Sequence, residues 1–146
     1  MRISLASDHA GYPFKEKLAA ELRSQGHQVK DFGTDSETSC DYPDFGIPAA
    51  RSVVEGAADR AILCCSNGIG MSMLANRIPG VRGALVYSSS TAERTRQHHD
   101  SNVLCLGAQE FGDETLLEWV STWLRTAYEA GRHARRIGKI EALDRA

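Results

Sequence analysis

A cysteine stands where an apolar run ends and a glycine-rich turn begins. In the segment RAILCCSNGIGMSMLANR, residues 60–77, Cys64 and Cys65 are followed by Ser-Asn-Gly-Ile-Gly. A thiol at this position could act as a nucleophile, a general base, a metal ligand or a small buried residue. Strand alternation points the two cysteines to opposite faces, so we expect Cys64, like Cys105, to lie in the core. Cys65 directly precedes the turn, where the start of a helix would favour its thiolate form.

Three further segments carry side chains that could do chemistry. The first expected strand ends in Ser-Asp8-His9, and RQHHDSN, residues 96–102, places His98 and His99 just before another strand. In GRHARRIGK, residues 131–139, Arg132 and Arg136 are four apart and therefore share one face of a helix. Paired guanidinium groups suit a phosphate, although a charged run near a chain end is more often a solvated face.

The turn SNGIG, residues 66–70, could bind an anion, because its glycines let the backbone approach a ligand and the N–H groups of the following helix are free. Two other phosphate-handling loops are excluded by spacing. The Walker pattern GxxxxGK[ST] is absent. A Cys-x5-Arg phosphatase loop is absent too, since the residue six beyond Cys65 is Met71. A phospho-accepting receiver domain would need an aspartate at the position of Cys65.

Short β-rich runs alternate with helical patterns along the whole chain. We expect strands at 2–7, 28–33, 60–65, 81–87 and 102–108, with helices near 12–25, 44–56, 69–77, 90–98, 113–129 and 132–143. This alternation predicts an α/β fold in which helices cover both faces of a parallel sheet. Ligands of such folds collect at the carboxyl ends of the strands. The length of 146 residues fits one domain, residues 1–146.

Composition excludes several classes of function. Hydrophobic residues make up 42% and charged residues 25%, and the net charge is −2, so bulk attraction to nucleic acid is not expected. No run is long enough for a membrane span or a signal peptide, which predicts a cytoplasmic protein without a membrane partner. The four cysteines show neither a CxxC pair nor the density of a disulfide scaffold, so we expect reduced thiols.

Together these motifs resemble the ribose-5-phosphate isomerase B family, which also includes galactose-6-phosphate isomerase subunits. The resemblance rests on SDHAG at 7–11, DYP at 41–43, CSNGIGMSMLANR at 65–77, RQHHDSNVLCLGA at 96–108 and YEAGRHARR at 128–136. It implies a Rossmann-like three-layer sandwich with a five-stranded parallel sheet. It also implies a reaction without cofactor or metal, and a homodimer, sometimes paired into a tetramer, with shared active sites.

The resemblance further implies an aldose–ketose isomerase that interconverts ribose 5-phosphate and ribulose 5-phosphate through a cis-enediolate. Cys65 would be the general base, His98 of the partner subunit would open the sugar ring, and Asp8 would hydrogen-bond sugar hydroxyls and relay protons. Amides around Asn67, Gly68 and Gly70 would stabilise the oxyanion. The implied substrate-binding residues are His9, Tyr42, Ser66, Gly68, Gly70, His99, Arg132 and Arg136, with His9 and the two arginines on the phosphate.

Three positions depart from the usual family pattern: Asn67 replaces a threonine or serine, His99 replaces an asparagine, and Gln109 replaces an arginine. These changes concern substrate contacts, so another sugar phosphate remains an alternative, such as allose 6-phosphate, galactose 6-phosphate or a tetrose phosphate. Two other classes stay open: a zinc site built from Asp8, His9, Cys65, His98 and His99, and a non-enzymatic sugar-phosphate or nucleotide-binding module.

Six other side chains are expected to be structural. His27 and His133 are interpreted as surface or helix-end residues, and Met71 and Met73 as packing residues. Trp119 and Trp123 are four apart on the long helix expected near 113–129, a spacing typical of a core or subunit-contact stripe.

Overall fold

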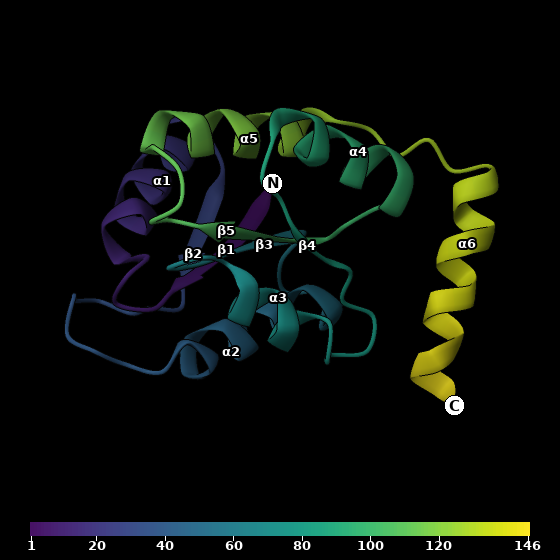
Figure 1. Cartoon of the computed structure of the whole chain (residues 1–146), viewed down its shortest axis with the longest axis horizontal. Helices are drawn as coiled ribbons and strands as arrows, with labels where there is room; N and C mark the ends of the chain where they lie inside the picture. The colour runs from purple at the N-terminus through teal and green to yellow at the C-terminus, as the bar shows by residue number, and fades with distance from the viewer.

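A computed structural model describes residues 1–146 as a three-layer α/β fold (Figure 1). The strands are β1 (Arg2–Ser7), β2 (Gln28–Asp31), β3 (Arg60–Cys65), β4 (Gly83–Leu85) and β5 (Val103–Gly107). All four pairings are parallel and the order is β2-β1-β3-β5-β4, which confirms the predicted sheet. The central strands β3 and β5 are almost wholly buried, as expected for strands that are covered on both faces.

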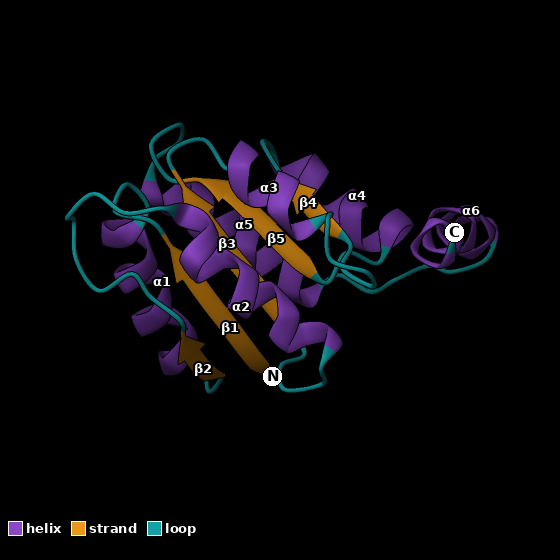
Figure 2. Ribbon diagram, turned by 90° about the horizontal axis from the view of Figure 1, so that it is seen from below, coloured by secondary structure: helices purple, strands orange, loops and turns teal.

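The helices are α1 (Tyr12–Ser24), α2 (Tyr42–Val54), α3 (Ile69–Ala75), α4 (Ser89–His99), α5 (Asp113–Arg125) and α6 (Arg132–Glu141), with a final 3-10 turn at Ala142–Arg145. Figure 2 shows α2 and α3 crossing one face of the sheet. The other face is covered by α1, α4 and α5, whereas α6 stands apart at the side of the molecule (Figure 1). No helix is both long and apolar enough to cross a membrane.

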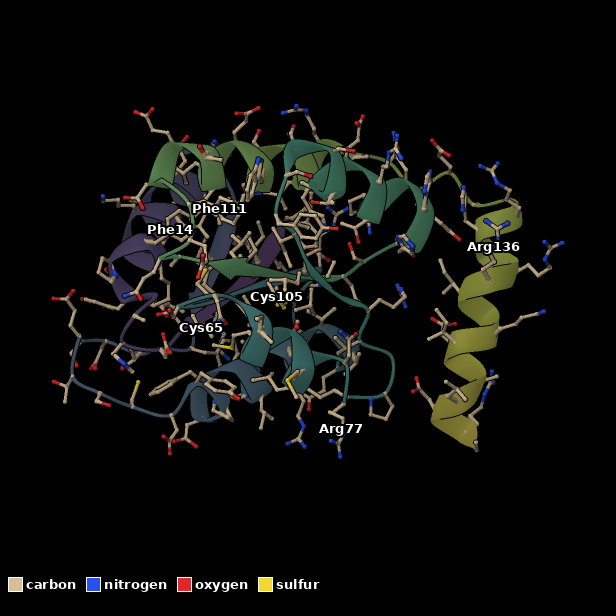
Figure 3. All side chains as sticks on the ribbon, in the orientation of Figure 1. Phe14, Cys65, Arg77, Cys105, Phe111 and Arg136 are labelled. Carbon is tan, nitrogen blue, oxygen red and sulfur yellow. The ribbon has the colours of Figure 1, made fainter.

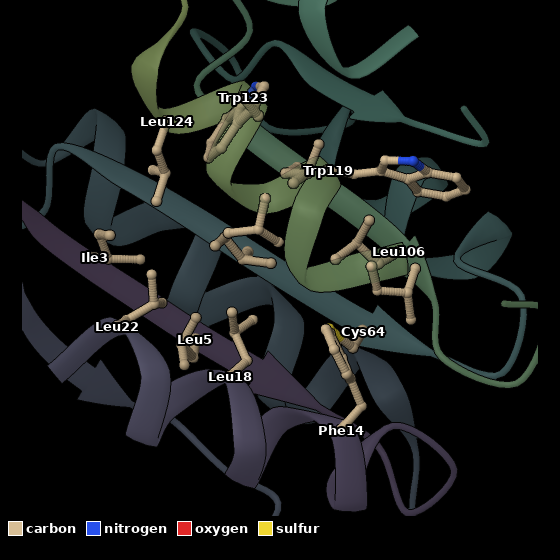
Figure 4. Packing of buried hydrophobic residues seen from close by; sticks show 14 of the residues in the cluster. Ile3, Leu5, Phe14, Leu18, Leu22, Cys64, Leu106, Trp119, Trp123 and Leu124 are labelled. Atoms are coloured by element: carbon tan, nitrogen blue, oxygen red, sulfur yellow. The ribbon is translucent and has the colours of Figure 1, made fainter. Parts of the chain in front are cut away.

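Two hydrophobic layers hold the sheet between the helices. The larger one packs side chains of α1 and α5 onto β1, β3 and β5, and includes both tryptophans, Trp119 and Trp123 (Figure 4). The smaller one lies under α2 and α3 and contains Met71 and Cys105. Cys64 belongs to the first layer and Cys65 to the second, so strand alternation is confirmed.

Several predicted boundaries were wrong in detail. The helix expected to reach residue 129 ends at Arg125, because Thr126 is extended with ψ 129°. The strand expected at 81–87 pairs only over Gly83–Leu85, at the edge of the sheet, and the one expected at 28–33 ends at Asp31. Met73 is not a packing residue, since it is 66% exposed on the outer side of α3.

The connections after β1 and β3 leave in opposite directions. These two strands are neighbours, but β1 leads into α1 on one face and β3 leads into α3 on the other. The carboxyl ends of β1 and β3 therefore form a topological switch point, and the crevice outside such a point is the usual ligand position in an open α/β sheet. Asp8 and His9 follow β1, and the SNGIG turn follows β3.

Candidate active site

Cys65 ends β3 in the wall of this crevice, and its sulfur accepts a hydrogen bond from the backbone. The N–H of Gly68 donates to Sγ at 3.2 Å, an interaction that stabilises negative charge on the sulfur. The side chain is 5% exposed, so most of the sulfur is shielded from bulk water. By contrast, the thiols of Cys64 and Cys105 are buried in the apolar layers, and this burial raises the pKa of each well above its ordinary value. Both are therefore inert core residues.

The turn after Cys65 is built by glycines at two positions where another residue would not fit. Gly68 has φ +79°, in the left-handed region, and begins α3. At Gly70 a Cβ would lie only 2.5 Å from Cζ of the Tyr42 ring. The ring of Tyr42 therefore lies directly against the turn, at the start of α2, where the sequence predicted a sugar-lining residue.

Some backbone amides of this turn donate hydrogen bonds within the protein, and others have no acceptor there. Gly68 donates to Cys65, and the N–H of Ile69 donates to Oδ1 of Asn67 at 3.0 Å. The N–H groups of Gly70 and Met71 have no acceptor in the protein. Of the amides expected to stabilise an oxyanion, that of Gly68 is therefore used by the sulfur, whereas that of Gly70 has no acceptor in the protein.

Asp8 faces the crevice from the end of β1. Its Oδ1 accepts hydrogen bonds from the N–H groups of Ala10 and Gly11, both at 3.0 Å, which fixes the carboxylate at the start of α1. Its backbone N–H donates to the carbonyl of Cys64 at 3.3 Å, so Asp8 and Cys65 lie on adjoining strand ends. The second oxygen, Oδ2, has no donor in the protein and can accept a hydrogen bond from a ligand.

His9 is held by a contact that sequence reasoning missed. The backbone N–H of Cys40 donates to Nδ1 of His9 at 3.2 Å. Because Nδ1 acts as the acceptor, a neutral His9 ring carries its proton on Nε2, which is then available as a donor. The residue responsible belongs to the long polar connection 33–44, and only the fold could reveal that this loop returns to β1.

Ser66 and Gln109 join the loops that follow β3 and β5. Ser66 Oγ donates to Gln109 Oε1 at 2.9 Å, and the backbone N–H of Gln109 donates to the carbonyl of Ser66 at 3.0 Å. Gln109, which was noted as a departure from the family pattern, therefore lies on the rim of the Cys65 loop.

The remaining predicted site residues lie elsewhere in the chain. His98 and His99 occupy the last turn of α4, which leads into the amino end of β5, whereas Cys65 lies at the carboxyl end of β3. Arg132 and Arg136 are exposed on α6. Figure 3 shows Cys65 and Arg136 on opposite sides of the molecule. A zinc site that combines Asp8, His9 and Cys65 with His98 and His99 of the same chain is therefore ruled out.

We refer to Asp8, His9, Tyr42 and the Cys65–Gly70 turn as the thiol half-site, and to His98, Arg132 and Arg136 as the arginine half-site. His99 lines a groove of about 320 Å³ between α6 and the sheet, together with Ile137 and Ile140.

His133 was interpreted as a surface or helix-end residue; it is the second residue of α6, but it does not lie on the surface. It is 5% exposed, and its ring stacks on His98 with centroids 4.2 Å apart and planes 10° from parallel. Burial is the main cause that lowers the pKa of His133 from its ordinary value. The neighbouring His98 and Arg132 lower this pKa further, whereas Glu129 raises it. His133 and Ile137 are four apart and form the buried face of α6, a spacing that could have indicated this burial.

Known proteins with this arrangement are numerous. A family model described as Ribose/Galactose Isomerase matches residues 3–140. A putative sugar phosphate isomerase of Bacillus subtilis is 40% identical, covering 96% of this chain and 95% of the relative. Ribose-5-phosphate isomerase B of Escherichia coli is 36% identical, covering 98% and 96%.

Solved structures agree with the same assignment. Ribose-5-phosphate isomerase B of Clostridium thermocellum is 43% identical, with a TM-score of 0.98 and coverage of 99% of this chain and 98% of that chain. The Mycoplasma genitalium enzyme with bound ribulose-5-phosphate is 38% identical, with a TM-score of 0.95 and coverage of 99% and 96%. The chain belongs to the ribose/galactose isomerase family.

Proposed function

We propose that this chain is an aldose–ketose isomerase that interconverts ribose 5-phosphate and ribulose 5-phosphate through a cis-enediolate, with Cys65 as the general base. The observation that carries the proposal is the sulfur of Cys65, held by the Gly68 amide beside backbone donors that have no acceptor in the protein. The relatives named ribose-5-phosphate isomerase B, one with ribulose-5-phosphate bound, support this choice of substrate.

The chemistry needs one base that serves two neighbouring carbons. The Cys65 thiolate takes the proton from C2 of the open-chain aldose, and the electron pair of that C–H bond forms the C1–C2 double bond while O1 becomes an oxyanion. The thiol then returns the proton to C1, and O2 loses its own proton to give the ketone. The free N–H groups of Gly70 and Met71 are suited to stabilise the oxyanion, an effect of about 3 to 4 kcal/mol for a well-placed donor.

Asp8 supplies the remaining proton transfer between O1 and O2. Its Oδ1 is occupied by two backbone donors, which leaves Oδ2 for a sugar hydroxyl. The carboxylate can take the proton from O2 and give it to O1. The negative charge of the enediolate then moves from O1 to O2, where the ketone forms. The Nε2–H of His9 is suited to donate to a phosphate oxygen, since Nδ1 already accepts from Cys40.

The active protein is a homodimer, or a pair of such dimers, in this proposal. Arg136, which with Arg132 would bind the phosphate, lies on the opposite side of the molecule from Cys65 (Figure 3). His98, which would open the furanose ring, ends α4 before the amino end of β5, whereas Cys65 lies at the carboxyl end of β3. In a twofold dimer, each thiol half-site would face the arginine half-site of the partner. Each of the two resulting sites would contain all the groups that the reaction needs.

A panel of sugar phosphates tests the proposal directly. We expect the highest kcat/KM with ribose 5-phosphate and ribulose 5-phosphate, and lower values with allose 6-phosphate, galactose 6-phosphate and a tetrose phosphate. If one of these others is the best substrate, the isomerase class stands and the ribose assignment fails. If none is converted by purified, folded protein, the proposed function is wrong.

A further inference from the structure

The stacked pair of His98 and His133 joins the last turn of α4 to the first turn of α6. The two rings lie 4.2 Å apart and nearly parallel, and His133 is buried although both of its neighbours on α6 are exposed. The isomerase chemistry described above uses His98 but leaves His133 without a role. A buried titratable ring in direct contact with a reacting group calls for an explanation.

Glu129 strengthens the same contact from the segment before α6. Its backbone N–H donates to the carbonyl of Gln97, in the last turn of α4, at 3.0 Å. Its Oε2 lies 3.8 Å from Nε2 of His133, a buried atom that has no hydrogen-bond partner. Glu129 and His133 thus both meet the end of α4, one through Gln97 and one through His98.

The position of α6 depends on few other contacts. The helix stands beside the sheet and not on it (Figure 1), and a groove of about 320 Å³ separates the two. At the far end of α6, Glu141 pairs with Arg82 at 2.9 Å, and Asp144 accepts from the N–H of Gly80. At the near end, which carries Arg132, the linker to α6 contains Ala130 and Gly131, both with positive φ. The ring stack and the hydrogen bond of Glu129 to Gln97 flank this linker and set where α6 begins.

The cluster of His98, His133 and Glu129 contains ligand types of a zinc site, but its geometry does not suit a metal. The lone pairs of an imidazole lie in the ring plane, and in two parallel stacked rings they run side by side and do not converge on one point. The lowered pKa of His133, which faces His98, Arg132 and Arg136 as well as Glu129, is consistent with a neutral ring that adds no charge beside His98.

We propose that His133 is a positioning residue, which fixes the ring of His98 by stacking and thereby holds Arg132 and Arg136 in register with it. The inference rests on the proposed function for its effect on catalysis. The stack itself, and its effect on phosphate binding, can be tested without any turnover.

The experiment compares His133→Leu, which removes the flat ring, with His133→Phe, which keeps it, in the full-length protein. His27→Leu is the matched control, because His27 is a half-buried histidine that contacts the N-terminal amine far from this cluster. Three quantities are measured: the NMR shifts of the His98 ring protons, the Kd for inorganic phosphate, and kcat and KM for ribose 5-phosphate.

For His133→Leu we expect loss of the ring-current shift on His98, weaker phosphate binding, and a fall in kcat/KM of about tenfold to a hundredfold, shared between kcat and KM. His133→Phe should retain the ring-current shift and most of the activity, and His27→Leu should behave as wild type. A role in folding alone would lower stability in both His133 variants without this difference between them.

Unchanged His98 shifts and unchanged phosphate binding in His133→Leu would overturn the proposal, as would equal losses of activity in His133→Leu and His133→Phe. If the leucine variant does not fold, His133→Gln, which is polar but has no ring, takes its place with the same expectations. If the wild type isomerises no sugar phosphate, the proposed function fails, while the NMR and phosphate measurements still decide whether His133 positions this half-site.

Discussion

The thiol half-site and the arginine half-site are built by different means. Around Cys65, the contacts come mostly from the backbone: N–H groups of strand ends, loops and the glycine turn donate hydrogen bonds to the sulfur, Asp8 and His9. Around His98, side chains hold other side chains, through the ring stack between α4 and α6 and through the ion pairs Arg82–Glu141 and Arg96–Asp100. Backbone groups in strand ends and tight turns change position little. They therefore suit proton transfer from carbon, which needs a fixed geometry. Side-chain contacts suit a half-site that supplies charge and that, in the proposed dimer, fits against a second subunit.

The largest expected effect concerns the reacting atom of the thiol half-site. Cys65→Ser keeps the shape of the side chain but replaces the thiol with a hydroxyl of far higher pKa, so kcat should fall by about 10²- to 10⁴-fold. Steady-state kinetics on folded protein measures this loss. Cys105→Ala, in the same apolar layer but away from the crevice, is the control and should retain its activity per folded molecule. Wild-type turnover in Cys65→Ser would remove the proposed base.

A smaller effect is expected in the arginine half-site, where we expect binding to suffer more than chemistry. Arg136→Gln should raise KM by about tenfold to a hundredfold with a lesser change in kcat, since it removes a charged hydrogen bond to phosphate. Arg135→Gln removes an equally exposed charge from the next position, which points about 100° around the helix, and should leave KM near the wild-type value. Equal effects in the two variants would mean that only the net charge of α6 matters.

The rigidity of the thiol half-site can be tested at its glycine turn. In Gly70→Ala the new Cβ would meet Tyr42 at 2.5 Å, so the free energy of unfolding should fall by about 1–3 kcal/mol, and kcat/KM should fall with it. Urea denaturation measures the first quantity. Gly138→Ala on α6 meets nothing within 4 Å and should stabilise the protein by up to about 1 kcal/mol. If Gly70→Ala leaves the free energy of unfolding unchanged, the turn is not tightly packed.

The smallest effect is a pH dependence in the arginine half-site. The pKa of His133 is lowered in the folded chain, so below the ordinary histidine value of about 6.5 the unfolded chain binds the proton more readily. The free energy of unfolding should therefore decrease as the pH falls below about 6.5, and His133→Phe should decrease less. His27 also has a lowered pKa, caused by its burial and then by the N-terminal amine, so the difference between the two proteins isolates His133. Parallel profiles would contradict this account of His133.

The sequence predicted the fold around Cys65 well because this part of the chain is specified by short-range patterns. The apolar run before Cys65 fixes a buried strand, and the glycines that follow fix the turn, so the position of the sulfur follows from short-range rules. The parallel sheet and both helical layers follow in the same way from the alternation of strands and helices. The assignment of Cys64 and Cys105 to the core was also confirmed.

The arginine half-site was less predictable because it depends on contacts between distant segments. The burial of His133 results from the return of α6 to the end of α4, and no pattern around residue 133 specifies that partner. The early end of α5 at Arg125 also depends on such a contact, since Glu129 bonds to Gln97 and does not continue the helix. The hydrogen bond from Cys40 to His9 joins residues 31 positions apart and has no local signal.

The central claim is that the two half-sites act across two subunits, and mixed oligomers test it most directly. Cys65→Ser is mixed with the double variant His98→Asn, Arg136→Gln, and the subunits are exchanged. In a dimer with shared sites, half of the pairs are mixed and each has one intact site, so the mixture should recover about a quarter of wild-type activity. If verified mixed dimers remain as inactive as the parent variants, the half-sites do not meet across subunits and the account is wrong.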